Sequence, residues 1–291
     1  MADREASWMK VGILSNPARP ETSALAERIR ASLARRDIEA YQSTPEHEEE
    51  EARLPPDLDA LITLGGDGTM LRAAHLHAGN GTPILGIHMG RLGFLAEVRQ
   101  GAWEESLDRL CDGDYWLEER AMLRCHLHRE EEVHGPWEAL NEVVIGRSSN
   151  GHMIELSTYV DSGYFATYMA DGLIVATATG STAYALSAGG PILPPELPNM
   201  LLVPICPHLS FDRTIVLASG AMVRIEVVSR GEGIVVVDGV TQGALRPGEH
   251  IDVAKSPHVT RFVRMYDRRQ VYETLVERLQ PRKVIRPDDR R

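Results

Sequence analysis

The chain has 291 residues, enough for one large or two ordinary domains with sizeable hydrophobic cores. Its 42 acidic residues against 31 Lys and Arg give a formal net charge of -11, the opposite of the balance usual in general nucleic-acid or anionic-membrane binders. Any anion that the protein binds is therefore expected to be captured locally.

The cysteines and the N-terminal segment indicate the compartment. Cys111, Cys125 and Cys206 are widely spaced and form no CxxC pair, which argues against a disulfide framework and a zinc site. The first residues lack the apolar core of a signal peptide, and no apolar run is long enough to span a membrane. The sequence thus predicts a cytoplasmic protein with reduced thiols, without a nucleic-acid or membrane partner.

From Val11 to about Val98 the pattern alternates between strand and helix. Strands are expected at 11–16, 60–64 and 83–88, and helices from Glu21 to Arg36 and from Thr69 or the glycine before it. Strands that alternate with helices predict a parallel α/β sheet.

From about Trp116 onward the segments are short, rich in Val, Ile, Thr and Tyr, and separated by turns. Strands are expected within 122–128, 139–147, 154–160, 173–179, 214–219, 223–228, 233–239 and 250–255. Such a series is typical of a β-sandwich or a folded double sheet. The spacing of Val271, Leu275 and Leu279 predicts a last helix over 268–280, followed by a basic tail.

The most informative short segment is Gly65-Gly66-Asp67-Gly68. It follows a strand expected at 59–64, and open α/β sheets bind ligands at the carboxyl ends of their strands. Glycines there let backbone N–H groups approach phosphate oxygens, and the next helix N-terminus favours negative charge. The three glycines and Thr69 therefore form a candidate phosphate loop, although the sequence matches neither a Walker loop nor G-x-G-x-x-G.

Asp67 is a carboxylate within this candidate phosphate loop. Such a residue can hold the Mg²⁺ of a nucleotide, or accept a proton from a hydroxyl that attacks phosphorus. Both roles indicate phosphoryl transfer. The alternative is that Asp67 is only a turn residue or a helix cap.

Two later segments carry polar groups suited to a nucleotide. Asn141 and Glu142 begin an apolar strand, where they could hydrogen-bond an adenine edge and a ribose diol, or could merely be solvated at a strand edge. Residues 182–188 read as a short helix capped by Ser181 and stopped by 189–191. This helix offers hydroxyls and Tyr184, which can stack on a base, or it simply packs against the sheet.

Taken together, the motifs resemble those of the bacterial NAD kinases over nearly the whole chain, from Val11 to Val263. They are, in order, "GGDGTMLRAA", "GIHMGRLGFLAEV", "ERAMLRCHL", "LNEVVIGR", "ADGLIVATATGSTAYALSAGGPI", "PICPH" and "VVVDG". GGDG also occurs in diacylglycerol kinases, sphingosine kinases and phosphofructokinases, whereas the NE and GSTAY motifs are more discriminating. The resemblance implies transfer of the terminal phosphate of ATP, or of polyphosphate, to the 2′-hydroxyl of the adenosine ribose of NAD, giving NADP, with a divalent metal such as Mg²⁺.

The resemblance also implies the architecture. A Rossmann-like parallel α/β domain is expected over 1–110 and 262–291, and a β-sandwich-like dinucleotide-binding domain over 111–261. The C-terminal segment is expected to pack back on the first domain. A homodimer or homotetramer is implied as well.

The implied site is carried over residue by residue. Asp67 matches the proton acceptor, which makes it the general base. The NAD-binding residues implied are Asp67, Gly68, Arg72, Asn141, Glu142, His152, Met169, Asp171, Thr182, Ala183, Tyr184, Ala185, Leu186 and Ser187. No residue is assigned as a metal ligand.

The chain departs from the family pattern at several positions. His88 stands where Asn is usual, Ala170 where Gly is usual and Ala178 where Pro is usual. Where the family usually has Asp-Gly-Gln, this chain has Asp238-Gly239-Val240, and Gln242 follows two residues later. A glutamine contact is therefore left out of the implied site. Two other classes remain open: a lipid kinase, which needs an apolar acceptor groove, and a dinucleotide-sensing module without catalysis.

Overall fold

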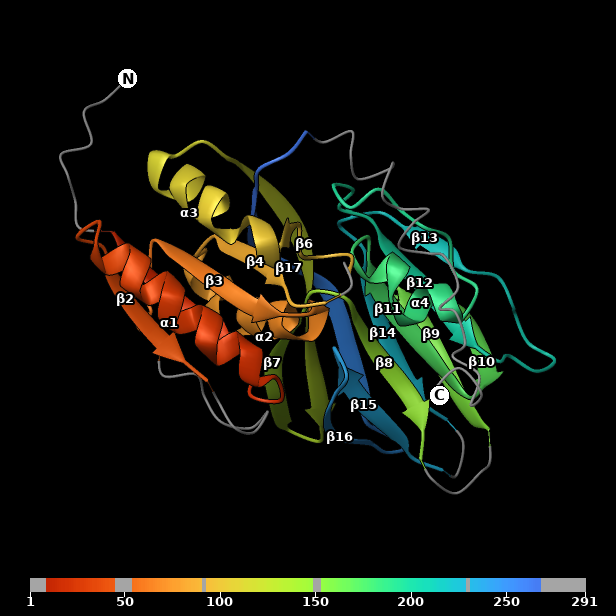
Figure 1. Ribbon diagram of the computed structural model, residues 1–291. Helices are drawn as coiled ribbons and strands as arrows, with labels where there is room; N and C mark the ends of the chain where they lie inside the picture. The colour runs from red at the N-terminus through yellow and green to blue at the C-terminus, as the bar shows by residue number, and fades with distance from the viewer. Residues whose placement is uncertain (1–8, 45–53, 91–92, 149–152, 229–230, 268–291) are drawn as a thin grey trace, which may run out of the picture.

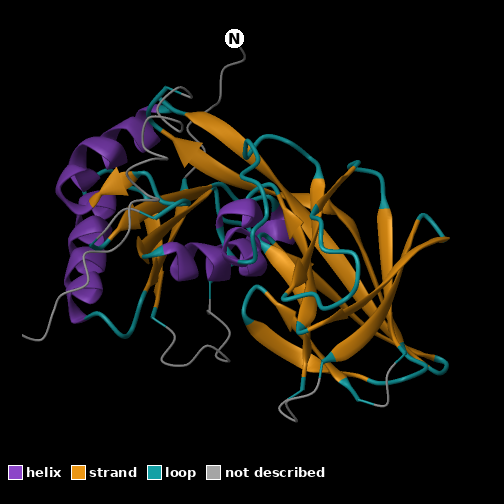
Figure 2. Cartoon of the chain, turned by 90° about the vertical axis from the view of Figure 1, so that its right-hand side faces the viewer, coloured by secondary structure: helices purple, strands orange, loops and turns teal. Residues whose placement is uncertain are grey.

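The structure, a computed structural model, describes residues 9–44, 54–90, 93–148, 153–228 and 231–267 (Figures 1 and 2). His152 and the helix expected over 268–280 lie outside these ranges. No helix within them combines the length and the apolar character that crossing a bilayer requires.

The first part of the chain alternates strands and helices, as predicted. Its elements are β1 (Lys10–Ser15), α1 (Pro20–Ala34), β2 (Glu39–Ser43), β3 (Ala60–Gly65), α2 (Asp67–His77), η1 (Ala78–Asn80), β4 (Ile84–His88), β5 (Val98–Arg99), η2 (Gln100–Ala102) and α3 (Trp103–Asp112). The neighbouring strands β4, β3, β1 and β2 are parallel. All six residues of β3 are buried, as expected for the centre of a sheet covered on both faces.

Helices cover both faces of this parallel sheet. Helix α1 begins with Pro20, which suits the first helical position, and buries Leu25, Ile29 and Leu33 on the sheet together with apolar residues of α3. Helix α2 packs Met70 and its neighbours on the opposite face. The carboxyl end of β3 therefore lies between two helical layers.

The second part is rich in strands. Its elements are β6 (Trp116–Arg129), β7 (Glu132–Ala139), β8 (Glu142–Arg147), β9 (Ile154–Val160), β10 (Gly163–Ala170), β11 (Gly172–Thr177), η3 (Gly180–Thr182), α4 (Tyr184–Ser187), β12 (Met200–Ile205), β13 (Ile215–Leu217), β14 (Met222–Val227), β15 (Gly233–Val237), β16 (Val240–Leu245) and β17 (His250–Arg264). A six-stranded antiparallel sheet runs in the order β13-β12-β11-β8-β15-β16. It packs on the antiparallel part of an eleven-stranded sheet.

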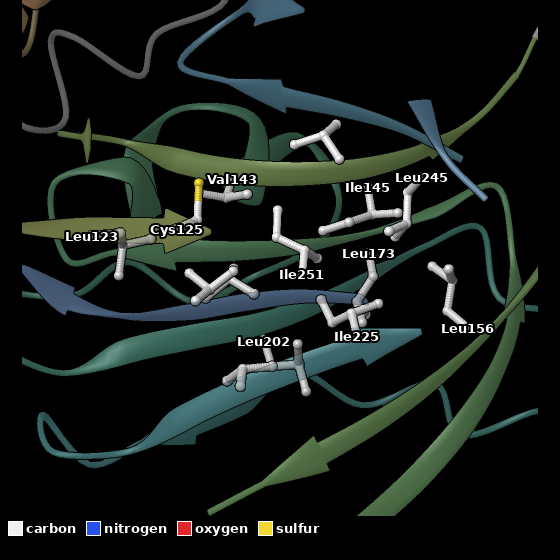
Figure 3. Packing of buried hydrophobic residues seen from close by; sticks show 14 of the residues in the cluster. Leu123, Cys125, Val143, Ile145, Leu156, Leu173, Leu202, Ile225, Leu245 and Ile251 are labelled. Carbon is white, nitrogen blue, oxygen red and sulfur yellow. The ribbon is translucent and has the colours of Figure 1, made fainter. Parts of the chain in front are cut away.

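The largest hydrophobic core lies between the two sheets. Side chains such as Val143, Ile145 and Leu173 from one sheet meet Ile225 and Ile251 from the other (Figure 3). Buried and half-buried residues alternate along β14, which is typical of a sheet with one face in the core. The expected β-sandwich-like domain is confirmed.

The long strand β17 joins the two parts of the molecule. It pairs antiparallel with β14 and β6, and near its carboxyl end Phe262 pairs in parallel register with Ile84 of β4. The chain thus returns to the first domain, as expected. Because one sheet runs through both parts, the boundaries at 110/111 and 261/262 stay a prediction.

Candidate functional site

The turn after β3 is shorter than the sequence predicts. Helix α2 begins at Asp67, not at Thr69 or Gly68, because the N–H groups of Thr69 and Met70 both bond to the carbonyl of Gly66, at 3.0 and 3.3 Å. Asp67 is therefore the first helical residue, where its negative charge is favoured by the helix dipole.

The carboxylate of Asp67 is held by the backbone of the loop that follows β4. Oδ2 accepts a hydrogen bond from the N–H of Phe94 at 2.7 Å, and Oδ1 accepts one from Leu95 at 3.1 Å. A Cβ atom added to Gly93 would lie only 2.2 Å from Oδ1, so glycine allows the loop to approach this closely. Each oxygen keeps a second lone pair for a further donor.

The Asn141–Glu142 turn is held by Asp238, whose side chain is fully buried. The Asp238 carboxylate accepts hydrogen bonds from the N–H groups of Leu140, Asn141 and Glu142 at 2.7, 2.9 and 2.8 Å. The N–H of Asp238 in turn donates to the carbonyl of Glu142 at 3.0 Å. The aspartate of the "VVVDG" motif thus fixes the backbone of the NE motif.

Helix α2 reaches the same carboxylate. Nε2 of His75 lies 2.7 Å from Oδ2 of Asp238. Because α2 starts with Asp67, this contact connects the helix that carries the candidate base with the Asn141–Glu142 turn. Among the predicted binding residues, Arg72 lies half-buried in the same helix.

Glu142 is buried, with 8 % of its surface exposed. Burial, followed by the charge of Asp238, raises the pKa of its carboxyl group to about 8, although a hydrogen bond from the backbone N–H of Tyr184 opposes the rise. At neutral pH the group is therefore mostly protonated. A protonated carboxyl group can donate one hydrogen bond as well as accept others, which suits a ribose hydroxyl.

The GSTAY segment packs directly against the Asn141–Glu142 turn. The N–H of Thr177, at the end of β11, donates to the carbonyl of Asn141 at 2.8 Å. A Cβ atom on Gly180 would lie 2.1 Å from that carbonyl oxygen, so only glycine fits there without displacement. The structure thus brings together the two segments that the sequence indicated separately.

The helix expected at 182–188 is split into the two short pieces η3 and α4. The prediction that Ser181 caps it is wrong, because its hydroxyl donates to the Ala178 carbonyl at 2.6 Å and accepts from the Leu193 N–H at 3.0 Å. Ala185 packs into a small core formed with β11 and β12. Tyr184 is 44 % exposed, so its ring is accessible to a base.

Two other predicted binding residues lie elsewhere. Gly172 of β11 pairs with Gly146, whereas Ala176 pairs with Glu142, so Asp171 lies at the far end of β11 from the GSTAY segment, roughly 20 Å along the strand. There its Oδ1 pairs with Nε of Arg147 at 2.9 Å. Met169 belongs to β10 near the same end. Within one chain these residues do not join the group around Asp67.

Within the described ranges, one group of three side chains has the composition and spacing of metal ligands, and it does not lie beside Asp67. His128, His250 and Asp252 lie near the start of β17, the end remote from β4. Arg224 already pairs with both carboxylate oxygens of Asp252, at 2.8 and 2.9 Å. This group is therefore better described as an ion-pair cluster than as a catalytic metal site.

Known proteins resemble this chain over most of its length. Its residues 41–115 match the family model for the ATP-NAD kinase N-terminal domain, and residues 140–265 match that for the ATP-NAD kinase C-terminal domain. The NAD kinase of Chloroflexus aggregans is 38% identical over 270 residues, which are 93% of this chain and 98% of that protein. The chain belongs to the NAD kinase family. The prediction that it is an enzyme of this family is thereby confirmed.

Other members of the NAD kinase family agree with this assignment. The NAD kinase of Moorella thermoacetica is 40% identical over 267 residues, 89% of this chain and 85% of that protein. A crystal structure of yeast NADH kinase complexed with NADH matches with a TM-score of 0.80 at 26% identity, covering 95% and 89% of the two chains. An NAD kinase from Archaeoglobus fulgidus in complex with ATP matches with a TM-score of 0.75 at 26% identity, covering 93% and 98%.

Sequence reasoning missed three groups that hold the candidate site together. They are the loop 93–95, His75 and the carboxylate of Asp238. The loop had one available signal, a glycine after a strand whose end lies at the ligand-binding edge of the sheet. His75 and Asp238 are 163 positions apart, and no local pattern joins them.

Proposed function

We propose that this enzyme transfers the terminal phosphate of ATP to the 2′-hydroxyl of the adenosine ribose of NAD, giving NADP, with Asp67 as the general base. The observation that carries the proposal is the position of the Asp67 carboxylate. It stands at the N-terminus of α2, oriented by the N–H groups of Phe94 and Leu95. Inorganic polyphosphate is the alternative donor to be tested.

The chemistry follows from that position. A ribose hydroxyl is a weak nucleophile at neutral pH, and a positioned base contributes about 10²–10⁴-fold. The ribose oxygen forms a bond to the terminal phosphorus, the bond from phosphorus to the bridging oxygen breaks, and ADP leaves. The proton of the hydroxyl passes to a free lone pair of Asp67. The helix N-terminus and the glycine N–H groups stabilise the charge on the phosphate.

The dinucleotide is assigned to the surface formed by the Asn141–Glu142 turn and the GSTAY segment. Hydrogen bonds and the close approach of Gly180 hold these two segments together. The protonated Glu142 and the amide of Asn141 supply donors and acceptors, and the exposed Tyr184 ring supplies a stacking surface. These hydrogen-bonding groups and the stacking surface suit a nucleotide, whereas a lipid acceptor would not need them.

A divalent metal, Mg²⁺, is proposed as the partner of the nucleotide. In sites of this kind Mg²⁺ is bound by one or two carboxylates together with substrate phosphates. Asp67 is the carboxylate in the turn, and the described residues around it form no closed set of three ligands. The residues present therefore fit a metal carried mainly by the phosphates, whose charge it would neutralise.

A coupled NADP-formation assay tests the proposal. NAD and NADH are offered as acceptors, ATP and polyphosphate as donors, with Mg²⁺ present or removed by a chelator, and diacylglycerol and sphingosine serve as control acceptors. NADP formation that needs the metal supports the proposal. Tight NAD binding without product would favour a sensing module, and phosphate transfer to a lipid would favour a lipid kinase.

We further propose that the enzyme is a homodimer or homotetramer. Exposed apolar side chains support an interface with a second copy. They include Tyr164 and Phe165 on β10 and Phe211 in the segment between β12 and β13. Light scattering at assay concentrations measures the mass directly, and a monomer would refute the proposal. The cytoplasmic location stays a prediction.

A further inference from the structure

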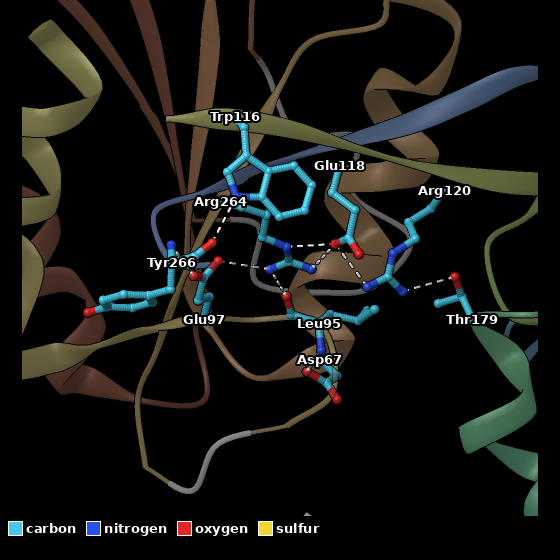
Figure 4. A network of polar contacts seen from close by, with 9 residues as sticks. All are labelled: Asp67, Leu95, Glu97, Trp116, Glu118, Arg120, Thr179, Arg264 and Tyr266. Carbon is cyan, nitrogen blue, oxygen red and sulfur yellow. Dashed lines mark hydrogen bonds and ion pairs between the residues drawn. The ribbon is translucent and has the colours of Figure 1, made fainter. Parts of the chain in front are cut away.

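A buried cluster of three charged side chains lies between Asp67 and the GSTAY segment. Glu118 and Arg120 come from β6 and Arg264 from β17, and their exposed fractions are 2 %, 4 % and 8 %. Oε2 of Glu118 accepts hydrogen bonds from Nε of Arg264 at 2.7 Å and from Nη2 of Arg120 at 2.9 Å (Figure 4). We refer to Arg264, Glu118 and Arg120 as the buried triad.

One end of the buried triad reaches the candidate base. Nη1 of Arg264 donates to the carbonyl of Leu95 at 2.7 Å. The N–H of the same Leu95 donates to Oδ1 of Asp67 at 3.1 Å. The backbone of Leu95 is therefore fixed on both sides of its Cα atom, by a guanidinium on one side and by the Asp67 carboxylate on the other.

The other end of the buried triad reaches the GSTAY segment. Nη1 of Arg120 donates to Oγ1 of Thr179 at 3.2 Å. The Thr179 carbonyl in turn accepts a hydrogen bond from Oγ1 of Thr182, at 3.1 Å, and Thr182 is one of the predicted NAD-binding residues. An unbroken series of hydrogen bonds thus connects Asp67 with the segment assigned to the dinucleotide (Figure 4).

Stability alone does not explain the buried triad. Taking charges out of water is costly, and well-packed apolar groups in the place of a buried ion triad are often neutral or stabilising. Burial raises the pKa of Glu118, but the charges of Arg264 and Arg120 outweigh it and hold that pKa below its ordinary value. The Phe262 ring lies 5.1 Å from the Arg264 guanidinium and 5.8 Å from that of Arg120, which restricts both.

We propose that the buried triad sets the position of the Asp67 carboxylate relative to the dinucleotide-binding segment, so that Arg264, Glu118, Arg120 and Thr179 are positioning residues. The inference rests on the proposed function. None of the four is assigned to the substrate or to the reacting atoms. They act through Leu95 on one side and through the turn at Thr179 on the other.

The first experiment removes one hydrogen bond and keeps the shape. Thr179→Val deletes the hydroxyl that accepts from Arg120, and Thr179→Ser keeps it. Because a misplacement of about 1 Å can cost two orders of magnitude in rate, we expect Thr179→Val to lower kcat by about 10- to 100-fold. The KM values for NAD and ATP should change by less than about threefold. Thr179→Ser should restore kcat.

A matched control separates positioning from packing. Thr260→Val removes another buried hydroxyl of the same region, which donates to Sδ of Met122 and belongs to no part of the series. It should lower the melting temperature about as much as Thr179→Val while leaving kcat unchanged. If Thr179→Val keeps kcat within about twofold of the native value, or if Thr260→Val lowers kcat equally, the buried triad is only structural.

A second variant tests the opposite end. Arg264→Lys keeps the charge, but an ammonium group cannot span Glu118 and the Leu95 carbonyl as the guanidinium does. If the hydrogen-bonded series acts as one unit, the double variant with Arg264→Lys and Thr179→Val should lose less kcat than the product of the two single fold-losses. Independent, multiplicative losses would overturn the inference. Absence of NADP formation by the native enzyme would instead overturn the proposed function, so the two failures are distinguishable.

Discussion

The imidazole of His75 and the carboxylate of Asp238 meet at 2.7 Å, and this contact joins helix α2 to the turn that carries Asn141 and Glu142. The same carboxylate accepts three consecutive backbone N–H groups of that turn. One buried side chain therefore sets the distance between the helix that begins with Asp67 and a predicted NAD-binding pair.

Asp238→Asn should weaken both the fold and NAD binding. The amide replaces one acceptor oxygen by an NH2 group, which is a donor. That NH2 group must then face either the N–H groups of Asn141 and Glu142 or the N–H of Leu140, and it cannot accept a hydrogen bond from them. The unmet groups are expected to cost about 1–3 kcal/mol of the free energy of unfolding. Chemical denaturation and NAD titration measure the two effects. Asp161→Asn is the matched control, because its exposed carboxylate accepts one backbone N–H, that of Met222. Equal stability of the two variants would refute the anchoring role.

The pKa of Glu142 predicts a pH dependence of stability. The folded carboxyl group has a pKa of about 8, above the ordinary 4.5, so the folded state binds the extra proton between these values. Its stabilising contribution is present below pH 4.5 and is lost as the pH rises through 8, by about 1.4 kcal/mol per pH unit at most.

Glu142→Gln tests this directly, because glutamine does not titrate. The free energy of unfolding of the variant, minus that of the native protein, should increase between pH 5 and pH 8 and level off above it. Glu132→Gln, at a carboxylate that is 79% exposed, controls for the loss of an acidic charge. A difference that is constant with pH would show that Glu142 is ionised in the folded protein.

Gly93→Ala should displace the candidate base. The added Cβ atom would lie 2.2 Å from Oδ1 and 2.3 Å from Oδ2 of Asp67, so either the carboxylate or the loop must move. We expect kcat to fall by about 10- to 100-fold. Gly101→Ala is the control, because a Cβ atom there meets nothing within 4 Å. A Gly93→Ala enzyme with native kcat would mean that the reaction tolerates movement of Asp67.

Asp67→Asn should retain NAD binding and lose most of the turnover. Loss of a positioned base is expected to lower kcat by about 10²–10⁴-fold. Steady-state kinetics measures kcat, and calorimetry measures NAD affinity. Asp59→Asn, at the other end of β3, is the control, because the Asp59 side chain accepts the N–H of Lys10 away from the site. Near-native kcat in Asp67→Asn would remove the base assignment.

The periodic parts of the chain were predictable from sequence. The strand expected at 154–160 is found as β9, and the helix expected from Glu21 to Arg36 is found as α1, because apolar spacing alone identifies such elements. The helix after GGDG begins earlier than predicted, since the Gly66 carbonyl accepts two N–H groups and closes the first turn over Asp67. Because glycines flank Asp67 on both sides, the sequence pattern indicates a turn there and not the first residue of a helix.

The candidate site was only partly predictable. Side-chain types and motif order pointed to Asp67, the Asn141–Glu142 pair and the GSTAY segment, whereas the groups that hold them come from distant positions. Glu118 and Arg264 are 146 positions apart, and Leu95 and Arg264 are 169 apart. Contacts of this kind depend on the folded topology, which a single sequence does not display.

The continuity of β17 restricts how the enzyme can move during a catalytic cycle. Strand β17 is hydrogen-bonded to β14 and β6 in the sandwich and meets β4 in the parallel sheet. Rotating one part of the molecule as a rigid body against the other would break the pairing of Phe262 with Ile84, through which β17 enters the parallel sheet. Any closure over the substrates is therefore expected from local segments such as the loop 93–95 and the short helices η3 and α4, while the two parts of the molecule keep their relative position.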